Sequence, residues 1–199
     1  MGAQTQIWWE SARAAGIVAW ALATLAVIGG LQLSTRLLRK PAPAWVLDVH
    51  RFVGGLAVVF TLVHMLGLLL DPYIGYGPAD LFVPFVSAFK PGAVALGIVA
   101  FYLLLAVELT SLAMRKLPRR VWHGVHLSSY LLFVLATVHG ITSGTDRHNI
   151  WFQWACLLAA ALVLFMTLVR ILAPRRGSAR PPRDRNPADQ TPADQATTG

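Results

Sequence analysis

The amino-acid sequence predicts an all-α membrane protein, a polytopic helix bundle with about five transmembrane helices. The first observation is composition: 56% of the 199 residues are hydrophobic and only 13% are charged, whereas soluble domains carry about 25% charged residues. The mean hydropathy is +0.57. The second observation is that five apolar segments are each long enough to cross a hydrocarbon core of ~30 Å as a helix. These segments are residues 14–35, 51–70, 92–113, 122–142 and 150–172.

The third observation is that the connections between the segments alternate in charge. Basic residues follow the first, third and fifth segments: Arg36, Arg39 and Lys40, then Arg115, Lys116, Arg119 and Arg120, then Arg170, Arg175, Arg176, Arg180, Arg183 and Arg185. The other two connections hold Asp71, Asp80 and Lys90, and Asp146 and Arg147. By the positive-inside rule the N-terminus is outside and the C-terminus cytoplasmic, in a multi-pass protein of the cell membrane. The net charge of +8 then favours contact with a bilayer containing anionic lipids, and we expect no nucleic acid partner.

The sequence divides into a membrane domain over residues 1–173 and a cytoplasmic tail over residues 174–199. The tail is rich in Pro, Arg, Asp and Gln, a composition that predicts disorder. The longest connection between apolar segments, 71–91, contains an apolar stretch over 81–86. This stretch is expected either to lie flat on the outer membrane interface or to be a plain loop.

Four histidines form two pairs inside the apolar segments. His50 and His64 are 14 residues apart, and His126 and His139 are 13 residues apart, so each pair spans ~20 Å along a helix. Because the second and fourth segments run in the same direction, His50 and His126 share the cytoplasmic level, and His64 and His139 share the outer level. Ionisable residues inside membrane spans indicate function.

Imidazole is a common ligand of haem iron, so the two levels predict two stacked b haems, each held by one histidine from each helix. The chain has no C-x-x-C-H motif, so the haems would be held by axial ligands alone. His50 and His64 lie about 40° apart around a straight helix, whereas His126 and His139 lie about 140° apart. The second pair therefore requires a bend, a π-bulge or irons approached from different sides.

Several neighbouring residues have two interpretations each. Arg51 pairs with a haem propionate or is one more positive-inside charge. His123 is a competitor of His126 as the axial ligand. Glu108 snorkels towards the basic loop or serves as a proton relay. Four glycines let a macrocycle approach the backbone or serve close helix packing: Gly54, Gly55, Gly67 and Gly140.

Two motifs carry a resemblance to a known family. His50-Arg51-x-x-Gly54 is followed by His64 after thirteen intervening residues, and Trp122-x-x-x-His126-x-x-Ser129-Tyr130 by His139 after twelve. Over about residues 15–145 the chain resembles the ferric reductase-like transmembrane domain, found in NADPH oxidases, ferric reductases and the haem subunit of the bacterial methionine sulfoxide reductase system. The resemblance implies that His50 and His126 bind the inner b haem, and that His64 and His139 bind the outer one.

The sequence departs from the oxidase members, which carry a C-terminal FAD- and NADPH-binding module, because only the tail follows the fifth segment. We therefore expect the haem subunit of an oxidoreductase. A separate flavoprotein reductase or quinol would donate electrons, and an acceptor or partner protein at the outer face would receive them. Two other functions remain open: a histidine-lined divalent-metal or proton transporter, and a non-catalytic membrane adaptor whose tail binds a partner.

Overall fold

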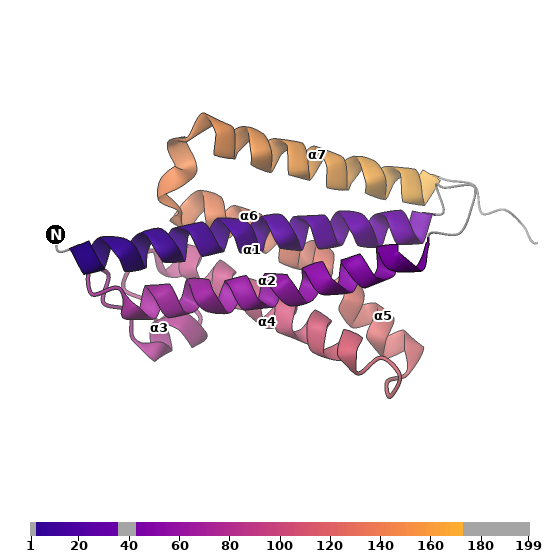
Figure 1. The fold of residues 1–199 in the computed structure, drawn as a ribbon, viewed down its shortest axis with the longest axis horizontal. Coiled ribbons are helices and arrows are strands. Elements are labelled where there is room, and N and C mark those ends of the chain that lie inside the picture. The colour runs from indigo at the N-terminus through magenta and orange to yellow at the C-terminus, as the bar shows by residue number, and fades with distance from the viewer. Residues whose placement is uncertain (1–2, 36–42, 173–199) are drawn as a thin grey trace, which may run out of the picture.

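The computed structural model describes residues 3–35 and 43–172 as an all-helical bundle (Figure 1). Its elements are α1 (Ala3–Thr35), α2 (Ala44–Leu70), α3 (Pro78–Phe82), α4 (Pro91–Leu112), α5 (Arg119–Leu127), α6 (Ser129–Ser143), the 3₁₀ helix η1 (Thr145–His148) and α7 (Ile150–Leu172). The tail proposed for residues 174–199, and the basic residues Arg36, Arg39 and Lys40, lie outside the described residues.

Five stretches within the described residues are long and apolar enough to cross a membrane, as predicted. They are Gln6–Ser34, Ala44–Leu70, Pro91–Leu112, Arg119–Ser143 and Ile150–Leu172. The first two begin earlier than the apolar segments of the sequence, because their helices extend into flanking polar residues. Pro43, with no N–H to donate, stands immediately before α2. The orientation of the bundle in the membrane stays a prediction from charge.

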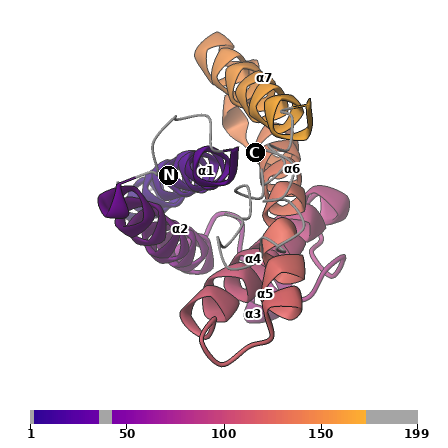
Figure 2. The same ribbon diagram turned by 90° about the vertical axis from the view of Figure 1, so that its right-hand side faces the viewer.

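The helices pack as neighbouring pairs around a common interior. α1 lies along α2, α4 lies along α6, and α7 packs beside α1, as the view along the bundle shows (Figure 2). The chain begins at the end that carries α3 and the α6–α7 connection, and α7 ends at the opposite end, which also carries the α4–α5 connection on the far side of the bundle (Figure 1).

Small residues bring the helices into close contact. Ala12, Ala15, Ala19 and Ala23 are spaced by three or four residues along α1, and all four are buried. Large apolar residues instead point outwards over much of the surface, as expected for helices in contact with lipid. Backbones that approach through small side chains gain van der Waals contact, which drives helix association in membranes.

The fourth span is interrupted where the histidine spacing requires it. α5 ends at Leu127 and α6 begins at Ser129. Between them, the Ser128 N–H and hydroxyl both donate to the Val125 carbonyl, at 3.0 and 2.6 Å. A bond to the residue three positions back tightens the helix locally and changes the direction in which later side chains project. The structure thus shows an interruption of the helix between His126 and His139, where the spacing predicted a bend, a π-bulge or irons approached from different sides.

The 71–91 connection contains the short helix α3. The Asp80 carboxylate accepts a hydrogen bond from the Gly77 N–H at 2.9 Å, which caps the helix start. The Tyr102 hydroxyl donates to the Phe82 carbonyl at 2.7 Å and ties the connection to α4. Apolar side chains after α3 are exposed, among them Val83, Phe85 and Val86, an arrangement suited to the membrane interface.

Gly67 gives the first test of this packing. It is buried, and a Cβ at this position would lie 2.9 Å from the Ala12 Cβ and 3.0 Å from the Ala12 Cα. We expect Gly67→Ala to destabilise the protein by about 1–3 kcal/mol through overpacking. Thermal unfolding in detergent, followed by circular dichroism, measures this.

The matched control is Gly92→Ala, where a Cβ would meet nothing within 4 Å. Because alanine favours a helix over glycine, the control is expected to be neutral or slightly stabilised. Equal stability of the two variants would contradict the close contact between α1 and α2.

Candidate functional site

The structure brings His50 of α2 and His126 of α5 together. Their ring centroids are 6.0 Å apart with an interplanar angle of 63°. Trp122 stacks on His126, with ring centroids 5.1 Å apart and planes inclined by 25°. His123 is exposed, and its ring contacts Trp122 instead. Of the two histidines at the start of the fourth span, His126 is therefore the one that faces His50.

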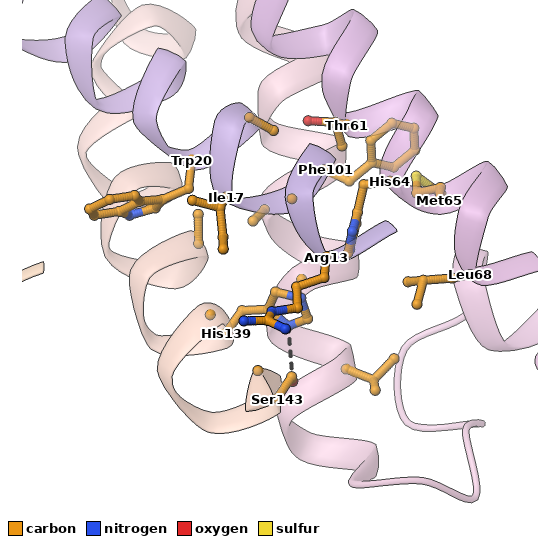
Figure 3. Close-up of a pocket in the computed structure, with 18 of the residues that line it drawn as sticks. Arg13, Ile17, Trp20, Thr61, His64, Met65, Leu68, Phe101, His139 and Ser143 are labelled. Atoms are coloured by element: carbon orange, nitrogen blue, oxygen red, sulfur yellow. Dashed lines mark hydrogen bonds between the residues drawn. The ribbon is translucent and has the colours of Figure 1, made fainter. Parts of the chain in front are cut away.

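His64 of α2 and His139 of α6 line a common cavity of about 230 Å³. α1 and α4 complete its walls with mostly apolar side chains, among them Ile17, Trp20 and Phe101 (Figure 3). The described residues contain no group of three or more His, Cys, Asp or Glu side chains placed to hold a metal ion. The structure thus brings His50 near His126 and places His64 and His139 in the lining of one cavity.

The His64 ring is held by the backbone of α1. Its Nδ1 lies 2.7 Å from the Ala12 carbonyl oxygen, and because a carbonyl only accepts, Nδ1 carries the proton. Gly16, one turn after Ala12, makes this approach possible, since a Cβ there would lie 2.8 Å from Nδ1. The other ring nitrogen, Nε2, is left with a free lone pair for a metal.

His139 repeats the same arrangement against α4. Its Nδ1 lies 2.7 Å from the Ala93 carbonyl oxygen, and a Cβ at Gly97 would lie 2.6 Å from its Cε1 atom. The Ser143 hydroxyl is 3.3 Å from the same Nδ1 (Figure 3). In both cases an Ala-x-x-x-Gly step on a neighbouring helix exposes a carbonyl to the imidazole.

The rings of His50 and His126, the inner pair, have weaker hydrogen bonds than those of His64 and His139. His50 lies over Gly30, where a Cβ would be 3.3 Å from its Cε1. It also interacts with the backbone of Ala26, four residues earlier, but its buried Nδ1 makes no hydrogen bond of good geometry within the described residues.

The Nδ1 of His126 lies 3.4 Å from the Ser111 hydroxyl. That hydroxyl donates its own proton to the Val107 carbonyl at 2.7 Å. It therefore accepts from the imidazole, which leaves Nε2 of His126 free as well.

The glycines singled out in the sequence have other neighbours. Gly67 packs closely on Ala12, whereas Gly140 faces Phe152 and also lines the cavity of His64 and His139. Gly54 and Gly55 face the Glu108 carboxylate of α4. Sequence reasoning missed Gly16, Gly30 and Gly97, although each stands four residues after an alanine.

Arg51 is exposed, and its Nη2 lies 3.8 Å from the Met114 sulfur.

One ion pair is found among the residues that line the cavity shared by His64 and His139. Arg13 of α1 donates to both carboxylate oxygens of Asp146 in η1, at 2.6 and 2.5 Å, and both residues line the cavity. Sequence reasoning missed Arg13, although a lone arginine in an apolar span is itself a signal. Tyr76 also lines this cavity. Burial raises the pKa of its phenol, so the phenol stays neutral at physiological pH.

Comparison with known proteins finds one match. A family model described as the ferric reductase like transmembrane component matches residues 13–137, which is more than half of the chain and includes His50, His64 and His126. No curated protein and no solved structure matches.

The Arg13–Asp146 pair can be measured with a double-mutant cycle. Because the contact is bidentate and the Asp146 side chain is only 12% exposed, we expect Arg13→Gln and Asp146→Asn to show a coupling energy of about 1 kcal/mol. Thermal unfolding of the two single variants and the double variant in detergent gives this value.

Glu10 supplies the control cycle. Its carboxylate lies 3.9 Å from Arg13 and is 58% exposed, so Arg13→Gln with Glu10→Gln should show almost no coupling. A coupling as large as that of Asp146 would mean that the cycle reports general charge effects instead of this contact.

Proposed function

The chain belongs to the ferric reductase-like transmembrane component family, and from this premise we propose that it conducts electrons through two b haems held by its paired histidines. Membership of the family implies transmembrane electron transfer. The observation that carries the finer proposal is the pairing itself: His50 with His126, and His64 with His139.

Two features of the inner pair suit a haem: the distance between the two imidazole rings, and nearby buried polar atoms that lack good hydrogen bonds. Two imidazoles that bind one metal ion from opposite sides, with metal–nitrogen bonds of ~2.0 Å, have ring centroids about 6 Å apart. The centroids of His50 and His126 are 6.0 Å apart. Within the described part of the chain, Nε1 of Trp122 is buried without a hydrogen-bond partner. Nδ1 of His50 interacts with the Ala26 backbone but makes no hydrogen bond of good geometry. Buried polar atoms normally have partners, so a bound group with acceptor atoms suits this place.

The outer pair fits through its cavity and its ring nitrogens. The cavity is apolar apart from a few polar side chains, which suits a flat, largely apolar cofactor. Both Nδ1 atoms are bound to backbone carbonyls, so both Nε2 atoms are available. Histidine ligands usually donate their second nitrogen in this way, because the hydrogen bond fixes the tautomer and the ring orientation.

In this proposal the four histidines hold and orient the two groups, and the apolar core keeps water away. Bound haem would supply reversible one-electron chemistry. Two histidines at each level would hold the group and would leave no place for a small ligand, which would favour electron transfer over ligand activation. Ala57 and Leu132 belong to a buried apolar cluster, and in the sequence each lies between the two histidines of its own span. A thin apolar layer would therefore separate the two haems.

The donor and the acceptor stay predictions. A flavoprotein reductase or quinol would deliver electrons at the His50–His126 end, and an acceptor or partner protein would collect them at the His64–His139 end. Arg13 and Tyr76, which line the outer cavity, would be the residues closest to that exchange.

The first test is a reduced-minus-oxidised absorbance spectrum of the purified protein, with haem per chain determined as the pyridine haemochrome. We expect two b haems per chain. His64→Ala and His50→Ala should each lose one haem, because each removes one ligand of a different pair. The controls His123→Ala and His148→Ala should keep both.

Absence of haem from protein expressed with ample haem supply would contradict the proposal and favour the metal or proton transporter. That alternative predicts pH-dependent flux into vesicles. One haem in the wild-type protein would restrict the proposal to a single pair, which the two histidine variants would identify.

A second test addresses the placement of His139. Gly97→Ala puts a Cβ within 2.9 Å of three atoms of this imidazole, so the ring must move. We expect loss of the outer haem, measured as a fall from two haems to one per chain. Gly92→Ala, in the same helix but with open space at its Cβ position, should retain two. Full haem content in Gly97→Ala would show that His139 binds no haem.

A further inference from the structure

Glu108 is a carboxylate inside the membrane domain, and it faces another helix. It lies in the last two turns of α4, within the span Pro91–Leu112. Its Oε2 lies 3.1 Å from where a Cβ of Gly54 would be, and its Oε1 lies 3.8 Å from that of Gly55. The two glycines of α2 thus provide the space that receives the carboxylate. The alternative in which it reaches out to the basic loop is not the conformation observed.

No partner neutralises this carboxylate at short range. Within the described residues, the side chain of Glu108 makes no hydrogen bond. The ion pairs found there join Arg13 to Glu10 and to Asp146. The positive charge that acts on Glu108 is Arg51, whose guanidinium contacts Met114. An acidic group in an apolar environment is costly as an unpaired anion, and such groups in membrane spans are typically functional.

The position of Glu108 connects it to both histidines of the inner pair. Gly54 stands one helical turn after His50 on α2, so the carboxylate approaches α2 one turn away from the position of His50. Ser111 stands almost one turn after Glu108 on α4, and its hydroxyl contacts Nδ1 of His126. The helices that pack against α4 are α2, α3, α5 and α6. They carry the following charged or titratable groups: Asp48, His50, Arg51, His64, Asp80, Arg119, Arg120, His123, His126, Tyr130 and His139.

We propose that Glu108 is a proton-binding site coupled to the His50–His126 electron site. When the site gains one electron from its donor, the Glu108 carboxylate binds one proton from the adjoining aqueous side. When the electron passes on to the outer site, the proton is released. Each step changes the local charge by one electron and one proton, so the apolar interior never carries the added negative charge alone. The inference rests on the proposed function, because it requires a redox group at the inner pair.

The sign of the effect follows from Coulomb's law. At high pH the ionised carboxylate opposes arrival of an electron, and at low pH the protonated form does not. The midpoint potential of the inner haem should therefore fall as pH rises through the range in which Glu108 titrates. The limit for one proton per electron is a tenfold change in the reduction equilibrium per pH unit, or about 59 mV.

The experiment is a potentiometric titration of the full-length protein in nanodiscs at several pH values between about 5.5 and 9. The His64→Ala background, which should keep only the inner haem, isolates its signal. We expect a pH-dependent potential in this background, and a flat profile when Glu108→Gln is added. Glu108→Asp should restore pH dependence, because it keeps the carboxyl group. Asp48→Asn, which removes a carboxylate from α2 instead, should leave the slope unchanged.

A pH-independent potential in the unmodified Glu108 protein would overturn the inference while the haem signal itself upheld the proposed function. A slope that survives Glu108→Gln but disappears in His123→Ala would assign the proton to His123 and also overturn it. If no haem is present, the proposed function fails first, and the inference fails with it. Uptake of protons on reduction, followed with a pH indicator dye, gives a second readout that is independent of electron throughput.

Discussion

The structure depends on close approach between helices at positions without a side chain. His64 and His139 reach the carbonyls of Ala12 and Ala93 only because a glycine stands four residues later on each of those helices. A helical carbonyl points towards the residue four positions on, so a side chain there would cover it. With that space open, the oxygen accepts a second hydrogen bond from the imidazole. The same contact joins two helices, fixes a tautomer and leaves the other ring nitrogen free to accept.

This arrangement explains why the site is built across helices instead of along one. α2 and the α5–α6 span supply the histidines, whereas α1 and α4 supply the backbone that orients His64 and His139. The broken fourth span follows from the same requirement. A straight helix would turn His126 and His139 about 140° apart, and the interruption at Ser128 lies between these two residues.

The two levels differ in ways that suit different tasks. The imidazoles of His64 and His139 are hydrogen-bonded to backbone carbonyls. The ion pair between Arg13 and Asp146 is among the residues that line their cavity. At the inner level the contacts are looser, and the Glu108 carboxylate lies close by without a short-range partner. A charge in this apolar region acts over a longer distance than in water, because the surrounding dielectric is low. The inner level is therefore where proton binding would influence electron transfer most.

The sequence by itself determined the five spans and the family, and it predicted two levels of histidines. Each follows from local properties: hydrocarbon thickness sets the length of an apolar run, and helical rise sets the depth of each histidine. Only the tertiary structure decided which glycines and carbonyls meet the histidines, and that Arg13 pairs with Asp146, 133 residues away. The reason is that the rotation of each helix about its own axis cannot be read from its sequence. A membrane helix such as α4 is apolar on every side, so its residue pattern does not reveal which face turns inwards.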